Sequence, residues 1–413
     1  MTGPSLERTL GTRDAVVIGL GAMLGAGIFA AFGPAAAAAG SLLLVGLAIA
    51  AVVATCNALS SAQLAAVHPS SGGTYVYGRR QLGPFWGHLA GFGFVVGKTA
   101  SCAAMALTVG AYAAPSFARP MAVAAVVSLT AVNLRGVAKT VRLTRLLVAV
   151  VVATLAFVVV AALLGGTASA AGLRSTVGVG PYDVLQSAGL LFFAFAGYAR
   201  IATLGEEVRD PERTIPRAIP LALGIVLVVY ALVAVSALAA VGPGVLAASK
   251  APLASVIAAG ELSAFTPLVR LGGTVAALAV LLSLLVGVSR TTFAMAREGE
   301  LPRWLDAVHP VHKVPHHAEG AVAVAVVALV LVVDLRGAIG FSSFAVLTYY
   351  AVTNASALTL RPAQRRYPPV VAIVGLIGCV VLAATLPLAS VLTGLVVIGA
   401  GAVVFLVRQQ RAA

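Results

Sequence analysis

The sequence predicts an all-α integral membrane protein with roughly twelve membrane-spanning helices. Of its 413 residues, 60% are hydrophobic and only 10% are charged, and the mean hydropathy is +1.04. Soluble domains carry about 25% charged residues. Apolar runs recur along the chain, and each is long enough to cross a bilayer, which takes about 20 residues. Arginine and lysine collect in the loops between these runs.

The expected spans are apolar runs bounded by charged residues or by clusters of Pro and Gly. In chain order they cover residues 15–39, 41–67, 85–114, 120–134, 143–166, 182–205, 216–241, 264–296, 318–335, 338–360, 368–387 and 388–407. The first run is too long for the apolar core of a signal peptide, so we expect an uncleaved anchor.

The distribution of basic residues predicts the orientation in the membrane. When successive loops are assigned alternately to the two sides, the outer side keeps only Arg119, Arg174, Lys250, Arg270 and Arg336. The inner side holds all other basic residues except two that lie within spans. Arg and Lys favour the cytoplasmic side, so both termini are expected there. Because the net charge of +14 is spread over these loops, nucleic acid is not an expected partner.

The first span contains a glycine-rich stretch that should interrupt its helix. Residues 21–29 read Gly-Ala-Met-Leu-Gly-Ala-Gly-Ile-Phe. Glycine destabilises a helix interior by about 1 kcal/mol relative to alanine, and broken helices at membrane depth normally line a cavity. We therefore expect an unwound segment at Gly25 to Gly27.

A transporter built from an inverted repeat should carry a second break in its other half. In the sixth span, residues 191–198 read Leu-Phe-Phe-Ala-Phe-Ala-Gly-Tyr, with Gly197 flanked by aromatic residues. The chain continues into Thr-Leu-Gly-Glu-Glu-Val-Arg-Asp-Pro at 203–211. We expect the second break beside Gly197.

These two stretches, GAMLGAGIF and FFAFAGYARIATLGEEVRDPERTIPRAI, resemble the amino acid-polyamine-organocation superfamily of permeases. The resemblance implies the five-plus-five inverted repeat of the sodium-coupled leucine transporter fold, with helices 1 and 6 broken at mid-membrane. It divides the chain into a cytoplasmic N-terminus (1–14), two repeats (15–166 and 182–360), two additional helices (368–407) and a cytoplasmic C-terminus (408–413).

Broken helices offer complementary ends to an amino acid. The N-H groups and positive dipole of a half-helix start suit a carboxylate, and the free carbonyls of a half-helix end suit an ammonium group. By the resemblance, the carboxylate is expected on the backbone of Gly25, Ala26 and Gly27. The ammonium is expected on carbonyls near Met23 and near Phe193, Ala194 and Ala196, beside Gly197.

Three aromatic residues of the sixth span, Phe192, Phe193 and Phe195, are candidates for a gate. The family pattern puts an occluding ring at Phe193, with Phe195 as a further candidate. The alternative is that these rings pack in the core or against lipid.

Lys98 is the one lysine inside an apolar span. A buried ionisable residue in a membrane is a functional-site candidate, since inserting it costs about 2.5 to 3.5 kcal/mol. Some relatives use a lysine of the fifth span for proton coupling, but here that span has none. Our hypothesis is that Lys98 takes this role by exchanging a proton, and the alternative is a static charge.

Other polar residues of the spans bear on substrate and ion choice. Arg200 follows the second break and either pairs with Glu206 or Glu207 or faces an intracellular vestibule. Ser283 and Ser289 are the candidates for a sodium site as the alternative coupling ion. No acidic residue lies in the central third of a span, which favours neutral substrates, although aromatic faces also hold cations.

No metal site and no cofactor is expected. The histidines between the eighth and ninth spans, His309, His312, His316 and His317, lie in a basic loop and fit no closed zinc site. The three cysteines have no CxxC spacing.

The sequence thus predicts a secondary transporter that moves amino acids across the cytoplasmic membrane by alternating access. Its expected partners are a small amino acid, the lipid bilayer and, as a hypothesis, protons. The alternatives are an amino acid exchanger, a polyamine or amine carrier, and a membrane sensor that binds an amino acid without moving it. No pairing of nucleophile and base lies in any span, so an enzyme is not expected.

Overall fold

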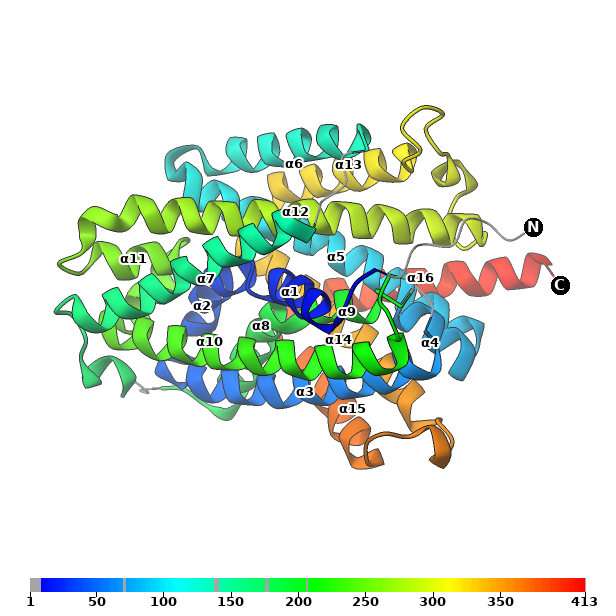
Figure 1. Cartoon of the computed structure of the whole chain (residues 1–413), viewed down its shortest axis with the longest axis horizontal. Helices are drawn as coiled ribbons and strands as arrows, with labels where there is room; N and C mark the ends of the chain where they lie inside the picture. The colour runs from blue at the N-terminus through cyan, green and yellow to red at the C-terminus, as the bar shows by residue number, and fades with distance from the viewer. Residues whose placement is uncertain (1–8, 70–71, 137–140, 175–177, 206, 413) are drawn as a thin grey trace.

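The computed structural model describes residues 9–412 except 70–71, 137–140, 175–177 and 206. Long helices run roughly parallel and antiparallel to one another along the length of the molecule (Figure 1). In the part of the chain that is described, the extended structure amounts to one isolated bridge between Leu10 and Val208. This bridge joins the segment before the first helix to the segment after the second break.

The described residues of the first half of the chain form seven α-helices and three short 3-10 helices. They are α1 (Thr12–Met23), α2 (Ala26–Ala39), η1 (Gly40–Leu42), α3 (Leu43–Val67), α4 (Thr74–Gln81), α5 (Pro84–Ala113), η2 (Pro115–Phe117), α6 (Ala118–Leu134), α7 (Val141–Leu164) and η3 (Ala170–Leu173).

The second half, as far as it is described, forms nine α-helices and four 3-10 helices. They are α8 (Pro181–Phe195), η4 (Ala196–Tyr198), α9 (Ala199–Ala202), α10 (Pro211–Ala248), α11 (Pro252–Ala258), η5 (Ser263–Phe265), α12 (Thr266–Arg297), η6 (Arg303–Asp306), α13 (His316–Val332), α14 (Leu335–Leu358), η7 (Pro362–Gln364), α15 (Pro369–Ala384) and α16 (Leu388–Ala412).

Eight helical segments of the described chain are long and apolar enough to cross a membrane, and α13 and α15 are shorter apolar helices. The prediction of a multi-span membrane protein is therefore confirmed, while the number twelve stays a prediction. α14 is long enough to cross a membrane but is less apolar than these eight segments. Four of its polar residues are buried against neighbouring helices: Ser342, Ser343, Thr353 and Asn354. Composition alone therefore does not predict that this helix packs inside the bundle.

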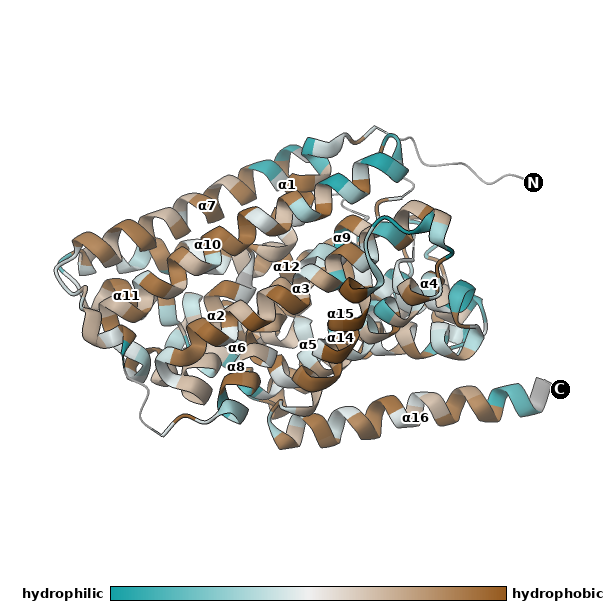
Figure 2. Cartoon of the chain, turned by 90° about the horizontal axis from the view of Figure 1, so that it is seen from below, coloured by the Kyte–Doolittle hydropathy of each residue, from teal (hydrophilic) through white to brown (hydrophobic). Residues whose placement is uncertain are grey.

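The outer surface has the character expected of a protein in lipid. Hydrophobic residues cover the sides of the bundle and the exposed length of α16, whereas hydrophilic residues gather around α4 at one end (Figure 2). On α16, Leu392, Leu395, Val396 and Val403 are exposed. Such a large apolar surface would be unfavourable in water and is stable against hydrocarbon.

Candidate site at the two helix breaks

The first span is broken, as the glycine pattern predicts, but the break begins one residue earlier than expected. α1 ends at Met23, Leu24 and Gly25 are not helical, and α2 begins at Ala26. Gly25 is extended, with φ −68° and ψ −152°. Gly27 therefore lies inside the first turn of α2 instead of in the unwound segment. The N-H groups of this first turn lack partners within the helix.

The sixth span is interrupted beside Gly197. α8 ends at Phe195, the 3-10 turn η4 covers Ala196–Tyr198, and the short helix α9 follows. The 3-10 turn takes backbone carbonyls out of the regular α-helical hydrogen-bond pattern. The sequence therefore located both breaks to within one or two residues.

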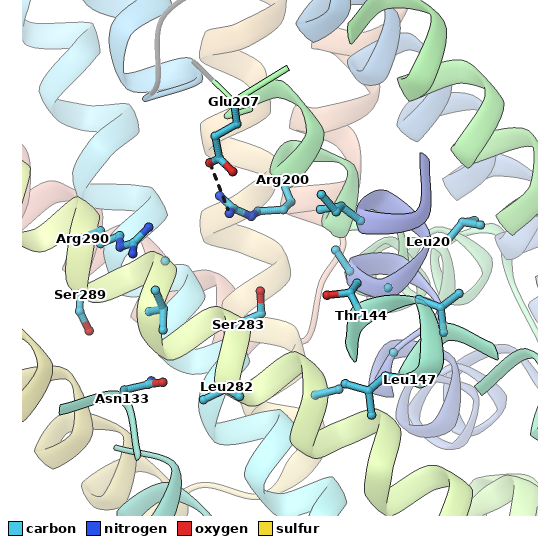
Figure 3. A pocket seen from close by; sticks show the side chains of 18 of the residues that line it. Leu20, Asn133, Thr144, Leu147, Arg200, Glu207, Leu282, Ser283, Ser289 and Arg290 are labelled. Atoms are coloured by element: carbon cyan, nitrogen blue, oxygen red, sulfur yellow. Dashed lines mark ion pairs between the residues drawn. The ribbon is translucent and has the colours of Figure 1, made fainter. Parts of the chain in front are cut away.

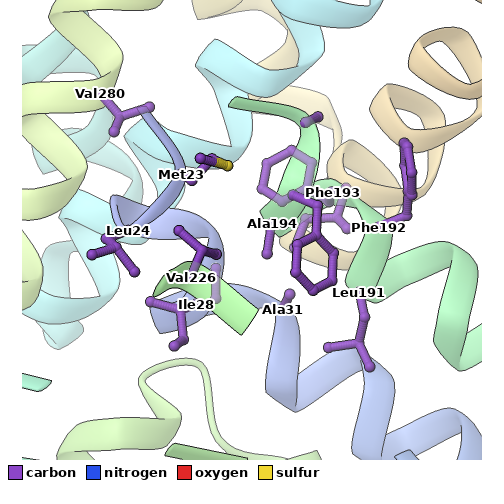
Figure 4. Packing of buried hydrophobic residues seen from close by; sticks show 14 of the residues in the cluster. Met23, Leu24, Ile28, Ala31, Leu191, Phe192, Phe193, Ala194, Val226 and Val280 are labelled. Carbon is purple, nitrogen blue, oxygen red and sulfur yellow. The ribbon is translucent and has the colours of Figure 1, made fainter. Parts of the chain in front are cut away.

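The two breaks pack directly against each other, and glycines make the close approach possible. A Cβ atom added to Gly27 would lie 2.7 Å from the Cα atom of Ala194, and one added to Gly197 would lie 2.8 Å from the backbone nitrogen of Met23. Both distances are shorter than real Cβ contacts. Figure 4 shows Met23 of the first segment beside Phe193 and Ala194 of the second. The requirement for glycine at position 27 thus comes from the neighbouring backbone.

Side chains from three other helices bind the carbonyls that the breaks release. The Tyr230 hydroxyl of α10 lies within hydrogen-bond distance of the carbonyl oxygens of Met23 and, at 2.9 Å, of Ala194. The Ala196 carbonyl accepts from Lys98 Nζ and from the Tyr350 hydroxyl, both at 3.4 Å. A tyrosine hydroxyl has one proton, so Tyr230 can donate to only one of its two carbonyls at a time.

The predicted binding residues therefore gather in one place. Met23, Gly25, Gly27, Phe193, Ala194, Ala196 and Gly197 lie at or beside the junction of the breaks, and Ala26 opens α2. Lys98, on α5, reaches the second break and is buried. The binding of an amino acid at this junction stays a prediction.

The three aromatic residues of the sixth span differ in environment. Phe192 and Phe195 are fully buried; Phe192 makes an edge contact with Tyr350, and Phe195 lies 5.0 Å, centroid to centroid, from Tyr230. Phe193 is 9% exposed. Packing therefore ties down Phe192 and Phe195, and Phe193 stays the better gate candidate of the predicted pair.

A cavity of about 730 Å³ leads to the first break from one end of the molecule. Its lining runs from Leu10, His312 and Pro315 in the connecting segments to Leu24 and Gly25 at the break. Figure 3 shows its polar side chains, which come from several helices. We call the end at which this cavity opens the open end.

The opposite side of the first break is closed by packing. Tyr112 of α5 donates its hydroxyl to the Phe29 carbonyl at 2.9 Å and accepts from the Leu253 N-H of α11 at 3.3 Å. The rings of Phe29 and Tyr112 are in edge contact. The first break thus communicates with the open end and is sealed by Tyr112 and α11 on the other side.

Arg200 satisfies both interpretations of its position. Its Nη2 atom lies 4.0 Å from Glu207 Oε1, its Nη1 atom donates to Thr203, and it lines the cavity (Figure 3). Glu206, the other predicted partner, lies outside the described residues. Because the Arg200 and Glu207 side chains are both more than one third exposed, this pair contributes little stability.

The two serines considered for sodium binding, Ser283 and Ser289, both lie on the cavity wall. The Ser289 hydroxyl donates to the Leu285 carbonyl one turn earlier in its own helix. Serine often makes this bond in membrane helices. Among the described residues, no group of three or more His, Cys, Asp or Glu side chains is arranged to hold a metal ion.

An ion pair holds the beginning of α1 at the open end. Asp14 accepts hydrogen bonds from Arg145 of α7 and from the N-H of Gly11. These bonds stabilise the ionised carboxylate and hold the pKa of Asp14 below its usual value. Asp14 therefore caps the helix that leads to the first break and connects it to α7.

Sequence reasoning missed the tyrosines that bind the breaks. Tyr112, Tyr230 and Tyr350 each lie in a predicted span, and each hydroxyl now has a partner at a break or at its closed side. A usable signal was present, because the hydroxyl of a buried tyrosine usually finds a hydrogen-bond partner. This signal does not predict which carbonyl each hydroxyl binds.

Comparison with known proteins identifies the family. The model of the family described as amino acid permease matches residues 10–405. An uncharacterized transporter of Mycobacterium tuberculosis is 62% identical over 404 residues, which cover 98% of this chain and 92% of that protein.

Two more distant relatives have named substrates. The branched-chain amino acid permease of Bacillus subtilis is 26% identical over 339 residues, 76% of this chain and 72% of that protein. The chloroplastic cationic amino acid transporter 7 of Arabidopsis thaliana is 26% identical over 385 residues, 86% of this chain and 66% of that protein. With the apolar helices and the family match, the chain is a membrane transporter that belongs to the amino acid permease family.

Proposed function

We propose that this permease moves neutral amino acids across the cytoplasmic membrane by alternating access around the two breaks. The observation that carries the proposal is the cavity, which reaches Leu24 and Gly25 from the open end while Tyr112 closes the other side. One open side and one closed side at a central site are the features of a single state of an alternating-access carrier. If the open end is cytoplasmic, as the basic loops predict, this state faces inward.

The breaks suit the two charged ends of an amino acid. The N-H groups at the start of α2, from Gly25 to Gly27, are suited to the carboxylate. The ammonium group is suited to whichever of the Met23 and Ala194 carbonyls lacks the Tyr230 proton. The side chain of Val280 lies where a Cβ atom on Gly25 would be. Substrate entry therefore requires Val280 to turn away, and Phe193 is the proposed gate on the other segment.

Neutral substrates are favoured because no carboxylate lies at the breaks among the residues that the structure describes. The polar groups at the junction are backbone carbonyls, tyrosine hydroxyls and Lys98. Lysine would repel a cationic side chain at close range. The chemistry of the breaks therefore favours neutral substrates, such as the branched-chain amino acids named for the Bacillus subtilis permease. It disfavours cationic amino acids, which are named for the Arabidopsis thaliana transporter.

Uptake into liposomes tests the proposed function. Purified permease is reconstituted, loaded with unlabelled leucine, and assayed for counterflow of radiolabelled leucine, with arginine and putrescine as the competing substrates. We expect leucine counterflow that excess arginine and putrescine leave unchanged. Binding of leucine without counterflow would favour a sensor, and preferential transport of arginine or putrescine would contradict the neutral substrate class.

We further propose that Lys98 couples transport to protons. Its Nζ atom contacts the Ala196 carbonyl at the second break, and the neighbouring titratable groups are Cys102 on its own helix and Tyr350 on α14. Loss of the Lys98 proton would weaken the contact with Ala196 and loosen the break. A proton taken up at Lys98 would restore it.

The coupling proposal has a matched control. Lys98→Met should abolish the stimulation of uptake by an inward proton gradient while counterflow persists, whereas Lys250→Met, at an exposed site, should leave both unchanged. Proton-driven uptake that survives in Lys98→Met would contradict coupling through Lys98 and favour an exchanger. Uptake that instead requires sodium, and loses that requirement in Ser283→Ala, would favour the sodium alternative.

A further inference from the structure

The wall of the cavity nearest the open end carries polar side chains that the proposed transport site does not use. Asn133 lies in the last turn of α6 and Glu319 in the first turn of α13, and the two helices pack against each other. Both residues line the cavity, as does Arg290 of α12. Figure 3 shows Asn133 and Arg290 on the same side of the cavity, away from Leu20.

Asn133 and Glu319 are buried, and polar atoms of both side chains lack hydrogen-bond partners among the described residues. Each side chain is 4% exposed. Within the described chain, Oε2 of Glu319 and both Oδ1 and Nδ2 of Asn133 have no hydrogen-bond partner. Burying a polar group without a hydrogen bond is unfavourable, and burying an unpaired carboxylate is more so. Unsatisfied groups on a cavity wall indicate a ligand that satisfies them.

The charges around these groups indicate which ligand fits. The carboxylate of Glu319 and the carbonyl of Asn133 are acceptors, suited to an ammonium group with its three donors. Arg290 is an exposed guanidinium close enough to act electrostatically on Glu319, and no ion pair within 4.0 Å joins them among the described residues. A molecule that carries both an ammonium and a carboxylate group matches this arrangement of separated opposite charges.

We propose that the cavity holds a second amino acid at this wall, with its ammonium group on Glu319 and Asn133 and its carboxylate on Arg290. The inference rests on the proposed function, because it takes the ligand to be the transported amino acid. The second position lies between the breaks and the open end. It holds an amino acid that has left the breaks, or one that waits to enter them.

Binding stoichiometry tests this position. Equilibrium binding of radiolabelled leucine to purified permease in detergent should show two classes of site in the wild type. Glu319→Gln keeps the shape of the side chain and removes its charge, so it should weaken the second class about tenfold or more and leave the first unchanged. Arg290→Gln should weaken the same class through the carboxylate.

The matched control is Glu207→Gln. Glu207 lines the same cavity but already pairs with Arg200, so its replacement should leave both classes of binding intact. Equal losses in Glu207→Gln and Glu319→Gln would overturn the proposal, because they would reflect only the charge of the cavity. An isotherm of Glu319→Gln that matches the wild type would also overturn it.

Failure of the second position is distinguishable from failure of the transport site. One class of leucine binding that is insensitive to Glu319→Gln overturns the second position and leaves the transport site standing. No leucine binding in the wild type contradicts the proposed function itself. The leucine isotherms are also measured in sodium chloride and, as the control, in choline chloride at equal ionic strength. If sodium occupies the second class of site and excludes leucine from it, the amino acid assignment is overturned.

Discussion

The two helix breaks are built from similar residues but differ in what surrounds them. The first, at Leu24 and Gly25, lines the cavity. The second, at Ala196–Tyr198, is enclosed by rings, with Tyr198 stacked on Tyr350 at 5.0 Å between centroids. The first break is thus the half of the candidate site that the cavity reaches. The second break is the half that surrounding aromatic rings hold in place.

The glycines of the two breaks are required for different reasons. A Cβ atom on Gly25 would meet the terminal methyl group of Val280, which is a side chain that can move. A Cβ atom on Gly197 would meet the backbone of Ala22 and Met23, which cannot move without displacing α1. The comparison teaches that one break can tolerate change at its glycine and the other cannot.

The largest effect is expected at the second break. Gly197→Ala forces the backbone of the two breaks apart, so we expect a loss of about 3 kcal/mol of stability or more, with loss of transport. The thermal unfolding midpoint in detergent measures this. Gly224→Ala, where a Cβ atom meets nothing within 4 Å, is the control and should unfold at or above the wild-type temperature. Similar midpoints for both variants would contradict the backbone contact.

A smaller effect is expected at the first break, and it should be reversible. Gly25→Ala overlaps Val280 and should cost about 1 to 2 kcal/mol. Val280→Ala removes the obstructing methyl groups, so the double variant should recover most of the loss that Gly25→Ala causes. A double-mutant cycle on unfolding midpoints measures the coupling. Additive effects of the two substitutions would show that Val280 does not cover Gly25.

Tyr230 is the side chain that connects the two breaks, and its removal tests that connection. Tyr230→Phe leaves the carbonyls of Met23 and Ala194 without their shared proton, which should cost about 1 kcal/mol. If the ammonium group of the substrate binds these carbonyls, added leucine should offset part of the loss in a thermal-shift assay. Tyr182→Phe, at an exposed site, should change neither quantity.

The smallest effect is expected where two donors serve one carbonyl. Tyr350→Phe removes one donor from Ala196, but Lys98 still reaches the same oxygen, so we expect a loss of about 0.6 kcal/mol. In a Lys98→Met background the same substitution should cost more. Equal costs in the two backgrounds, measured by thermal unfolding, would mean that the two donors do not share the Ala196 carbonyl.

Much of the candidate site could be predicted from residue types. Glycine clusters inside apolar runs place the breaks, because backbone flexibility is a local property. The first break nevertheless lies at Leu24 and Gly25 instead of Gly25 to Gly27. The sequence could not separate a glycine that unwinds a helix from one, such as Gly27, that lets another backbone approach. That distinction depends on Ala194, a residue far along the chain.

The partners of the breaks could not be predicted for the same reason. Tyr230, Tyr350 and Lys98 come from three different helices, and which carbonyl each binds depends on how those helices pack. α14 shows the limit in another way. Its polar residues weaken the apolar signal of a membrane helix, although the structure buries them inside the bundle.

By itself, the sequence determined that this protein is a multi-span helical membrane protein and where two of its spans break. Both follow from local chemistry, namely the transfer of apolar residues into hydrocarbon and the conformational freedom of glycine. Only the tertiary structure decided that the first break opens to a cavity and that tyrosines bind the released carbonyls. It also decided that, among the described residues, Glu319 Oε2 and the Asn133 side-chain amide lie on the cavity wall without hydrogen-bond partners. These features depend on which helix faces meet, and that is set by packing between residues distant in the chain.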